Sequence, residues 1–471
     1  MTMQHGAGGN EFQQLWHGQT TVHPLGLSLL LAMGVAMLVV RRRYAVWPMI
    51  VVACFIAPAQ RIVVAGADFD FLRIMVVFGW LRLVLRGELR PMRWGAVDVA
   101  TIAWVLVFFT MSLLRLGTDI LANQLGFLFD VAGMYLLFRM LVREWADVKQ
   151  VVFGFALISV PVAAAFTVEA LTARNMFAVL GGVPEITVVR DGRLRCQGAF
   201  AHPILAGLFW ASFLPLFFVQ AWEGGRRRLV ALAGIAAAGF IIVACASASP
   251  ITGVMFALIG GLGFFVRSWM QLIRWGVLFA LIGLHLVMKA PVWHLISRLD
   301  IVGGNSGYHR FLLIDGAINH VHEWWAIGTQ VGTRHWGHHT FDVTNYYLVQ
   351  CLHGGLLLLC LFVALISLAF RAVGRTWRRV AKDRVTVAWS WAMGVSLFVH
   401  ATSFLVISYF GQITMVWYLL LAMIGSMTTA AVRSPARQRR ARRVAPTHPR
   451  SIGQPISSPA RGAGVGRPAM I

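Results

Sequence analysis

Clustered arginines are the residues of this sequence that point most directly to a chemistry. Guanidinium groups keep their positive charge and bind phosphate oxygens through paired hydrogen bonds, so a group of them suits a pyrophosphate. Arg190, Arg193 and Arg195 form such a group within a short polar stretch. The alternative interpretation is a set of solvated loop charges, balanced by Glu185 and Asp191.

A further arginine is expected on a helix. The residues from 307 to 322 have the apolar spacing of an amphipathic helix, and one face of it would carry Arg310, Leu313, Ile314 and Ala317. A helix would hold Arg310 more firmly than a mobile loop, which favours recognition of a charged substrate. The alternative is a snorkelling side chain, or an ion pair with Asp315 or Asp300.

Residues able to take up a proton gather between His335 and Leu348, just before an apolar stretch. His338 and His339 could accept a proton from a hydroxyl at neutral pH, and Asp342 could do so if desolvation raised its pKa. Each of the three could instead be an interfacial hydrogen-bonding residue. Asn345, in the same segment, is a secondary site candidate and equally well a helix N-cap.

Metal-binding patterns are weak in this sequence. Neither an H-E-x-x-H motif nor a paired-cysteine motif is present, so we expect no metal. By residue type alone, a zinc site could be built from His320, His322, His335, His338 and His339. Asp68 and Asp70 have the spacing that chelates a divalent ion, although so short a motif arises often by chance. Asp130 lies in an expected apolar span, where it is a functional candidate. The alternatives are a buried partner of Arg139 or a misplaced span.

No cofactor is expected either. Nothing in the sequence resembles a P-loop or a dinucleotide-binding glycine motif. The driving force for a transfer reaction must therefore arrive with the substrate, for example as a phosphate-activated lipid in the same membrane. Only Cys196 among the cysteines lies in a polar loop, so no disulfide framework is expected.

The composition places most of the chain in a membrane. Of 471 residues, 58% are hydrophobic and 13% are charged, and the mean hydropathy is +0.71. Apolar stretches of about 20 residues predict an all-α, polytopic membrane protein with about 12 to 13 transmembrane helices. The formal net charge of +23 lies in short clusters between these stretches, which favours contact with membrane lipid and argues against nucleic acid as a partner.

Arginine-rich segments follow every second expected span, and such segments tend to remain in the cytoplasm. This alternation predicts a periplasmic N-terminus at 1–23, a transmembrane region at 24–432 and a disordered basic cytoplasmic tail at 433–471. Two periplasmic loops, about 171–203 and 292–345, are long enough to carry function, and the second should contain short helices.

Three segments of the chain, taken in order, resemble motifs of the O-antigen ligase and polymerase superfamily, which includes bacterial exopolysaccharide polymerases. The motifs are R-x-x-G-x-F-x-x-P leading into a span, an arginine-centred helix in the large outside loop, and N-x-x-L opening the next span before a glycine pair. They are matched by Arg195–Pro203 with His202, by Arg310 with Gly328 and Gly332, and by Asn345–Leu348 with Gly354 and Gly355. The resemblance covers about residues 60–430.

The resemblance implies an inner-membrane glycosyltransferase that uses undecaprenyl-pyrophosphate-linked oligosaccharides as donors, without nucleotide or metal. Arg195 and Arg310 would hold the pyrophosphate, and a histidine near the end of the large loop would activate the acceptor hydroxyl. Ligases of this family commonly show H-N where this chain has Thr344 and Asn345. The base is therefore expected to be His338, His339 or Asp342. His202 is a secondary candidate for the site.

That departure, together with the altered segment Ser247–Pro250, favours a polymerase of a secreted polysaccharide (exopolysaccharide or O-antigen) in the bacterial inner membrane. Other polysaccharide assembly and export proteins would then be partners. The first alternative is a ligase that transfers the finished glycan to lipid A core. The second is a flippase or transporter, which would need polar residues and broken helices at the bilayer midplane, where only Asp130 and Pro161 suggest them.

Overall fold

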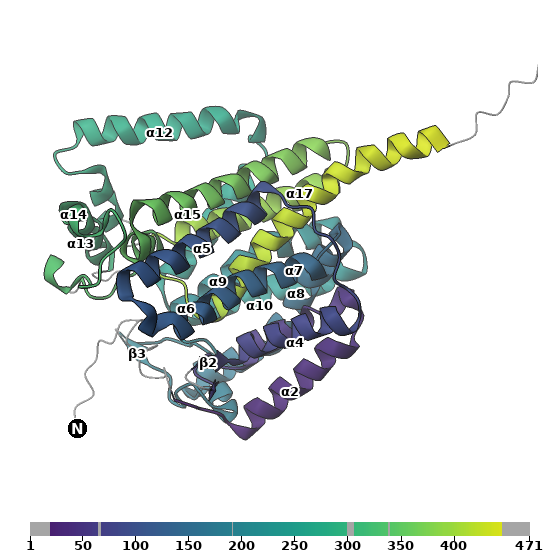
Figure 1. Ribbon diagram of the computed structural model, residues 1–471, viewed down its shortest axis with the longest axis horizontal. Coiled ribbons are helices and arrows are strands. Elements are labelled where there is room, and N and C mark those ends of the chain that lie inside the picture. The colour runs from purple at the N-terminus through teal and green to yellow at the C-terminus, as the bar shows by residue number, and fades with distance from the viewer. Residues whose placement is uncertain (1–18, 65–66, 191, 299–305, 338–339, 445–471) are drawn as a thin grey trace, which may run out of the picture. The chain divides into compact units, whose positions relative to one another are not determined.

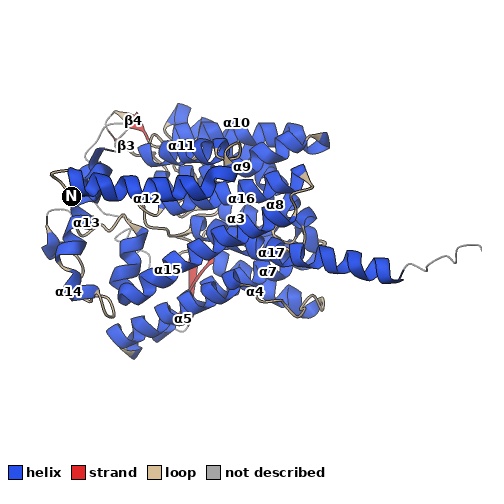
Figure 2. Cartoon of the chain, turned by 90° about the horizontal axis from the view of Figure 1, so that it is seen from above, coloured by secondary structure: helices blue, strands red, loops and turns tan. Residues whose placement is uncertain are grey.

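The computed structural model describes residues 19–64, 67–190, 192–298, 306–337 and 340–444. The chain divides into two units, Met1–Ala431 and Val432–Ile471, and the packing described below lies within the first. Helices make up almost all of the regular structure, and the described strands form only two short hairpins (Figure 2).

The fold is an all-α, polytopic membrane fold, as the composition predicts. Within the described residues, nine helical segments are long and apolar enough to cross a membrane, and two shorter apolar helices accompany them. The nine are Ala96–Leu116 (α5), Thr118–Leu141 (containing α6, Leu121–Leu128, and α7, Met134–Leu141), Trp145–Thr172 (α8), Pro203–Glu223 (α9), Gly225–Ala244 (containing α10, Arg228–Ala244), Arg267–Val287 (containing α12, Met270–Val287), Tyr346–Arg379 (α15), Arg384–Ser403 (α16) and Gln412–Ala430 (the first part of α17, Gln412–Val444). The shorter two are Pro24–Val39 (α2) and Ala248–Leu262 (α11).

The apolar stretch around residue 50 forms a much shorter helix than a membrane span needs. Helix α3 covers only Trp47–Phe55, and its nine residues rise about 13 Å, less than half of an apolar layer about 30 Å thick. The chain nevertheless returns to its starting side. Arg61, after α3, exchanges backbone hydrogen bonds of 2.9 and 3.0 Å with Thr21, before α2. The pair α2–α3 therefore forms a helical hairpin that brings Arg61 beside the start of α2.

Loops that the charge alternation assigns to one side of the membrane are joined to one another. Gln60 donates to the Leu180 carbonyl at 2.7 Å, Arg115 donates to the Thr329 carbonyl at 2.8 Å, and Gln412 donates to the Ala199 carbonyl at 2.8 Å. We call this end of the helices the site side; it comprises the described residues of 19–23, 56–70, 117–120, 173–202, 245–247, 288–345 and 404–411. Figure 1 shows its strands β2 and β3 and its short helices α13 (Ser306–Asn319) and α14 (Val321–Trp324) at the left-hand end of the helices.

The arginine-rich loops are joined in the same way at the other end. Arg42 pairs with Asp147 at 2.6 Å, and Arg82 donates to the Val40 carbonyl at 2.7 Å. Lys149 also pairs with Glu223, close to the end of α9. These contacts group the loops into the two sets that the alternating arginines predict.

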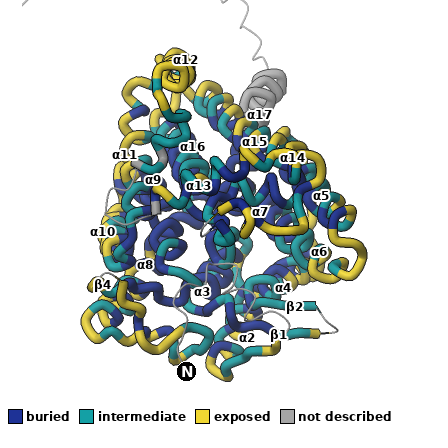
Figure 3. Tube along the Cα trace, turned by 90° about the vertical axis from the view of Figure 1, so that its left-hand side faces the viewer, coloured by how far each residue is buried: buried dark blue, intermediate teal, exposed yellow. Residues whose placement is uncertain are grey.

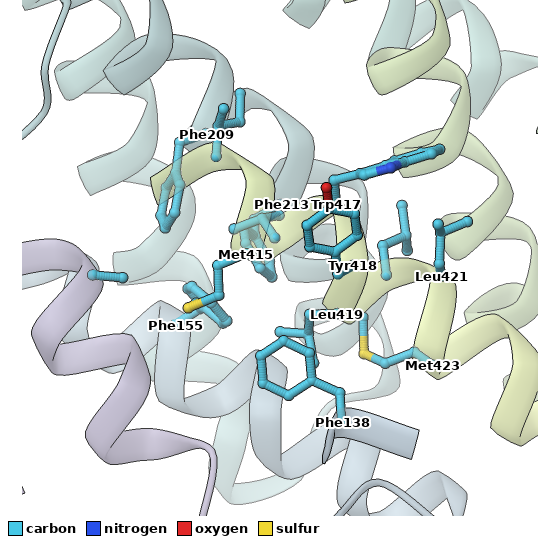
Figure 4. Close-up of a cluster of buried hydrophobic side chains, with 14 of the residues drawn as sticks. Phe138, Phe155, Phe209, Phe213, Met415, Trp417, Tyr418, Leu419, Leu421 and Met423 are labelled. Atoms are coloured by element: carbon cyan, nitrogen blue, oxygen red, sulfur yellow. The ribbon is translucent and has the colours of Figure 1, made fainter. Parts of the chain in front are cut away.

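Aromatic and aliphatic side chains fill the space between the helices. The first part of α17 contributes Met415, Trp417, Tyr418 and Leu421, which meet Phe138 of α7, Phe155 of α8, and Phe209 and Phe213 of α9 (Figure 4). Helix α12 differs, because none of its residues is buried and its exposed surface stands apart from this core (Figure 3). Lipid is the medium that would cover an apolar span of this kind.

Candidate functional site

Arg195 is fixed at the end of a small hairpin on the site side. Strand β3 (Val189–Arg190) pairs with β4 (Arg193–Leu194), and the Arg195 amide donates to the Val188 carbonyl at 3.0 Å. The next residue, Cys196, donates to the Ala244 carbonyl at the end of α10. The Arg195 side chain is only 9% exposed, which is unusual for a loop arginine.

A buried carboxylate, Glu169, shapes the segment that follows Arg195. It lies at the end of α8 and accepts hydrogen bonds from the amides of Gln197 and Gly198 and from the Thr187 hydroxyl, each at 3.0 Å. The side chain of Glu169 is fully buried. Sequence analysis missed this residue, although an acid near the end of an apolar span is a signal that could have pointed to it.

Arg310 reaches the same region from the large loop. It lies on α13 and is 8% exposed, with Leu313 and Ala317 buried on the same face, as the helical spacing predicts. Its Nη2 donates to the Ser249 hydroxyl at 3.2 Å. Asp315, one of the two acids suggested as its ion-pair partner, accepts from Trp293 and Asn319 instead, and Asp300 lies outside the described residues.

The two buried arginines converge on the turn between α10 and α11, residues 245–247. Ser249, which contacts Arg310, is in the first turn of α11. Burial raises the pKa of the Cys245 thiol, and the nearby charge of Arg195 opposes this shift. Two segments about 115 residues apart in sequence therefore direct guanidinium groups to one short turn on the site side.

Arg190 and Arg193 do not share this placement. They face each other across the β3–β4 hairpin, and both are exposed. The cluster of three arginines expected from the sequence therefore splits into one buried residue and two residues at the surface. Glu185, which the sequence offered as a balancing acid, pairs instead with Arg174 at 3.2 Å.

His202 is the N-cap of helix α9, and its imidazole carries its proton on Nε2. Its Nδ1 accepts from the Ile204 amide at 3.1 Å, which assigns the neutral tautomer protonated at Nε2. Burial, together with the positive charges of Arg195 and Arg190, lowers the pKa of His202 to about 4. His202 is therefore neutral near pH 7, with Nδ1 already engaged.

The segment proposed to supply the base is partly described. Asp342 is half-buried, and Asn345 is a helix N-cap whose Oδ1 accepts from the amides of Tyr347 and Leu348 at 2.9 and 3.2 Å. The capping interpretation of Asn345 is confirmed. His338 and His339 lie outside the described residues.

Gly354 and Gly355 interrupt helix α15, and the backbone of the large loop supplies hydrogen-bond partners at the interruption. Gly355 has a φ of +66°, and a Cβ atom there would meet the Trp325 and Ala326 carbonyl oxygens at 2.5 Å. The amide of Leu356 donates to the Trp325 carbonyl at 2.8 Å, and Thr329 donates to the Leu352 carbonyl at 3.0 Å. Glycine is required because no other residue leaves room for the loop backbone.

A cavity of about 440 Å³ lies beside these motifs. Gln197 and Ala201 line it from the segment after Arg195, and Tyr346 lines it from the start of α15. Its remaining wall is both acidic and aromatic, with Asp68, Asp70, Asp130, Tyr409 and Tyr418. Arg61 and Arg73 also line it, so the wall carries three carboxylates and two guanidinium groups.

The acids of the cavity are engaged by arginines and backbone rather than arranged as metal ligands. Asp68 pairs with Arg61 at 2.5 Å, and Asp70 caps α4 (Phe71–Leu85) by accepting from an amide at 2.7 Å. These contacts do not favour the chelating role that the D-x-D spacing suggested. The two acids are placed by a hairpin of β1 (Arg61–Val64) and β2 (Ala67–Asp70), which the sequence did not predict.

Asp130 pairs with Arg73 rather than with Arg139. It lies on a π-helical turn, Phe129–Gly133, inside the span, and such turns occur frequently at functional sites. Arg139 binds Asp98 at 2.5 Å near the arginine-rich end. The suggestion that Asp130 is a buried partner of Arg139 was therefore wrong, because the partners come from other helices.

No protein-family model matches the chain, and no curated protein matches its sequence.

Proposed function

We propose that this protein is a glycosyltransferase of the bacterial inner membrane that polymerises undecaprenyl-pyrophosphate-linked oligosaccharide repeats into a secreted polysaccharide. In this proposal the site side is periplasmic, as is the N-terminus, and the C-terminus is cytoplasmic. The single observation that carries it is the convergence of Arg195 and Arg310 on the α10–α11 turn. The resemblance to the O-antigen ligase and polymerase superfamily supports the same proposed function.

The chemistry assigned to the two arginines follows from their charge and burial. The acceptor hydroxyl oxygen attacks the anomeric carbon of the donor, and the bond from that carbon to the pyrophosphate oxygen breaks. The lipid pyrophosphate leaves with the electron pair, so negative charge develops on it. Buried guanidinium groups stabilise such charge more strongly than exposed ones, because less water screens them.

A base completes the reaction by taking the proton of the attacking hydroxyl. The candidates are His338, His339 and Asp342, which precede α15. The cavity that Tyr346 lines from the start of α15 supports a place for the acceptor glycan. The three carboxylates of its wall outnumber the two arginines, which disfavours a pyrophosphate there. Its carboxylate, amide and tyrosine groups offer hydrogen bonds and ring faces to an uncharged sugar.

The decisive experiment replaces each buried arginine in cells and measures polymer length. Arg195→Ala and Arg310→Ala should lower polymerisation by about 100- to 1000-fold and cause single lipid-linked repeats to accumulate. The matched control is Arg174→Ala in the same outer loop, because Arg174 is 74% exposed. Normal polymer from either buried-site variant, at normal protein abundance in the membrane, would refute the assignment.

The alternative functions, a ligase and a flippase or transporter, can be distinguished from a polymerase by the product that each one forms. Purified protein in detergent, mixed with lipid-linked repeats, should form polymer, whereas a flippase or transporter would leave the repeats unjoined. A ligase would leave the repeats unjoined unless lipid A core were supplied. Mass spectrometry of the acceptor end therefore distinguishes the three.

A further inference from the structure

A second polar cluster lies in the large outer loop, apart from the two arginines. It consists of His320, just before α14, Glu323 within α14, and His335 in the helical turn Arg334–Trp336. One ligand atom from each residue lies within 4.8 Å of the other two. We propose that His320, Glu323 and His335 form a zinc-binding site that fastens this loop.

The donor set favours zinc over the other common divalent ions. Two imidazole nitrogens and one carboxylate oxygen, with water in the fourth position, match tetrahedral zinc coordination. Magnesium and calcium prefer oxygen ligands throughout and would not select two histidines. Sequence spacing gave no indication of this set, because its members belong to none of the familiar zinc motifs.

Neighbouring groups already orient the three side chains. The Nδ1 of His320 contacts the Gly316 carbonyl at 2.8 Å, which leaves its Nε2 as the nitrogen with a free lone pair. A hydrogen bond from the second ring nitrogen to a backbone carbonyl is the usual support of a zinc-binding histidine. Trp336 stacks on the His320 ring and donates to Glu323 at 3.1 Å.

The carboxylate and the second histidine are already in contact. The Oε2 atom of Glu323 lies 2.8 Å from the Nε2 of His335. A bound zinc ion would replace this hydrogen bond by two coordinate bonds of about 2.0 to 2.2 Å. Without zinc, the same three residues form a histidine–glutamate hydrogen-bonded cluster, and the experiment below distinguishes the two states.

Zinc at this position would connect helix α13, which carries Arg310, to the segment after His335 that contains the proposed base. Trp324 donates to the Ala317 carbonyl of α13 at 2.8 Å, and Trp336 packs against Gly316 of the same helix. His335 belongs to the turn that precedes residues 337–345. The ion would therefore hold α13, and with it Arg310, in a fixed relation to that segment.

The test is zinc binding by the purified full-length protein without a polyhistidine tag. After removal of metal by a chelator, isothermal titration should detect one zinc equivalent, and excess magnesium or calcium should not displace it. His320→Ala and His335→Ala should each lower the zinc affinity by at least about tenfold. Cobalt bound to the wild-type protein should give the visible absorption bands of tetrahedral coordination.

The matched control is His322→Ala. His322 is adjacent to Glu323, but its side chain is 74% exposed and lies outside the cluster, so this variant should bind zinc as the wild type does. Wild-type protein that binds no zinc, or an equal loss of affinity in the His322 variant, would overturn the site. Zinc is titrated with no glycan present, so failure here leaves the proposed function untouched, and failure of polymerisation leaves the metal site untouched.

Discussion

Arg73 and Asp130 form a two-point ion pair at the wall of the cavity. Nε of Arg73 lies 2.7 Å from one carboxylate oxygen, and Nη2 lies 2.6 Å from the other. The pair joins α4 to the π-helical turn in the span Thr118–Leu141. A charged pair with this geometry fixes both side chains in one orientation.

Removal of one partner should therefore be costly. Asp130→Asn is expected to lower the free energy of unfolding by about 1 to 3 kcal/mol, because Arg73 would lose its counter-charge while remaining 15% exposed. Thermal unfolding in detergent measures the change. The comparison variant is Glu185→Gln, whose partner Arg174 is 74% exposed, and its effect should stay below about 1 kcal/mol. Equal effects would contradict the importance of burial.

Replacement of Gly198 by alanine should destabilise the fold. Its φ is +58°, and a Cβ atom would lie 2.3 Å from the Phe166 ring, so Gly198→Ala should cost about 2 to 4 kcal/mol from backbone strain and overpacking. Gly192→Ala provides the control, since its φ is also positive but nothing lies within 4 Å. That variant should lose only about 1 kcal/mol. Similar melting temperatures for the two variants would exclude the packing contribution.

Glu169→Gln should impair both stability and polymerisation. Only the side-chain oxygen of glutamine can accept a hydrogen bond, so at least one of the three donors now served by Glu169 would be left unpaired, at about 1 to 3 kcal/mol. The segment from Arg195 would then be held less firmly. Circular dichroism during heating gives the first effect and polymer length gives the second. A variant with normal polymer would show that Glu169 does not position Arg195.

His202 predicts a pH dependence of stability with a defined sign. Its pKa is about 4 in the folded protein, below its ordinary value of 6.5, so below pH 6.5 the unfolded chain binds a proton that the fold excludes. Stability should thus be full above about pH 6.5 and fall as the pH decreases toward 4, by about 2 to 3 kcal/mol near pH 4.5.

The variant His202→Asn isolates this effect, because asparagine keeps the helix cap but does not titrate. The difference in unfolding free energy between wild type and variant should shrink or reverse as the pH falls from 7 to 4.5. Other titrating groups contribute equally to both proteins. A difference that does not change with pH would contradict the neutral state of His202.

Helix type and placement could be predicted because they depend on local composition. The apolar stretches predict the spans, the spacing around Arg310 predicts its helix and buried face, and the position of Asn345 predicts its cap. These properties follow from residues within one or two turns of each other. The alternation of arginines likewise assigns to one side several loops that contact one another in the structure.

Contacts between distant segments could not be predicted in this way. Asp130 finds Arg73 rather than Arg139, and Glu169 organises a segment about 30 residues away, only because the helices pack as they do. The shortness of α3 has a similar origin. The apolar composition of a segment indicates that it can enter a membrane. The length of the helix that it forms depends on the structures at its ends, which for α3 include the β1–β2 hairpin.

The break at Gly354 and Gly355 makes the backbone of residues 325–329 a structural part of helix α15. Departure of that stretch would leave amide and carbonyl groups of a buried helix without partners, and each such group is expensive to expose to an apolar environment. The stretch should therefore stay in place in the folded protein. In the proposed function, a growing chain would then advance past this fixed backbone, and any opening that admits substrate would be formed by other segments.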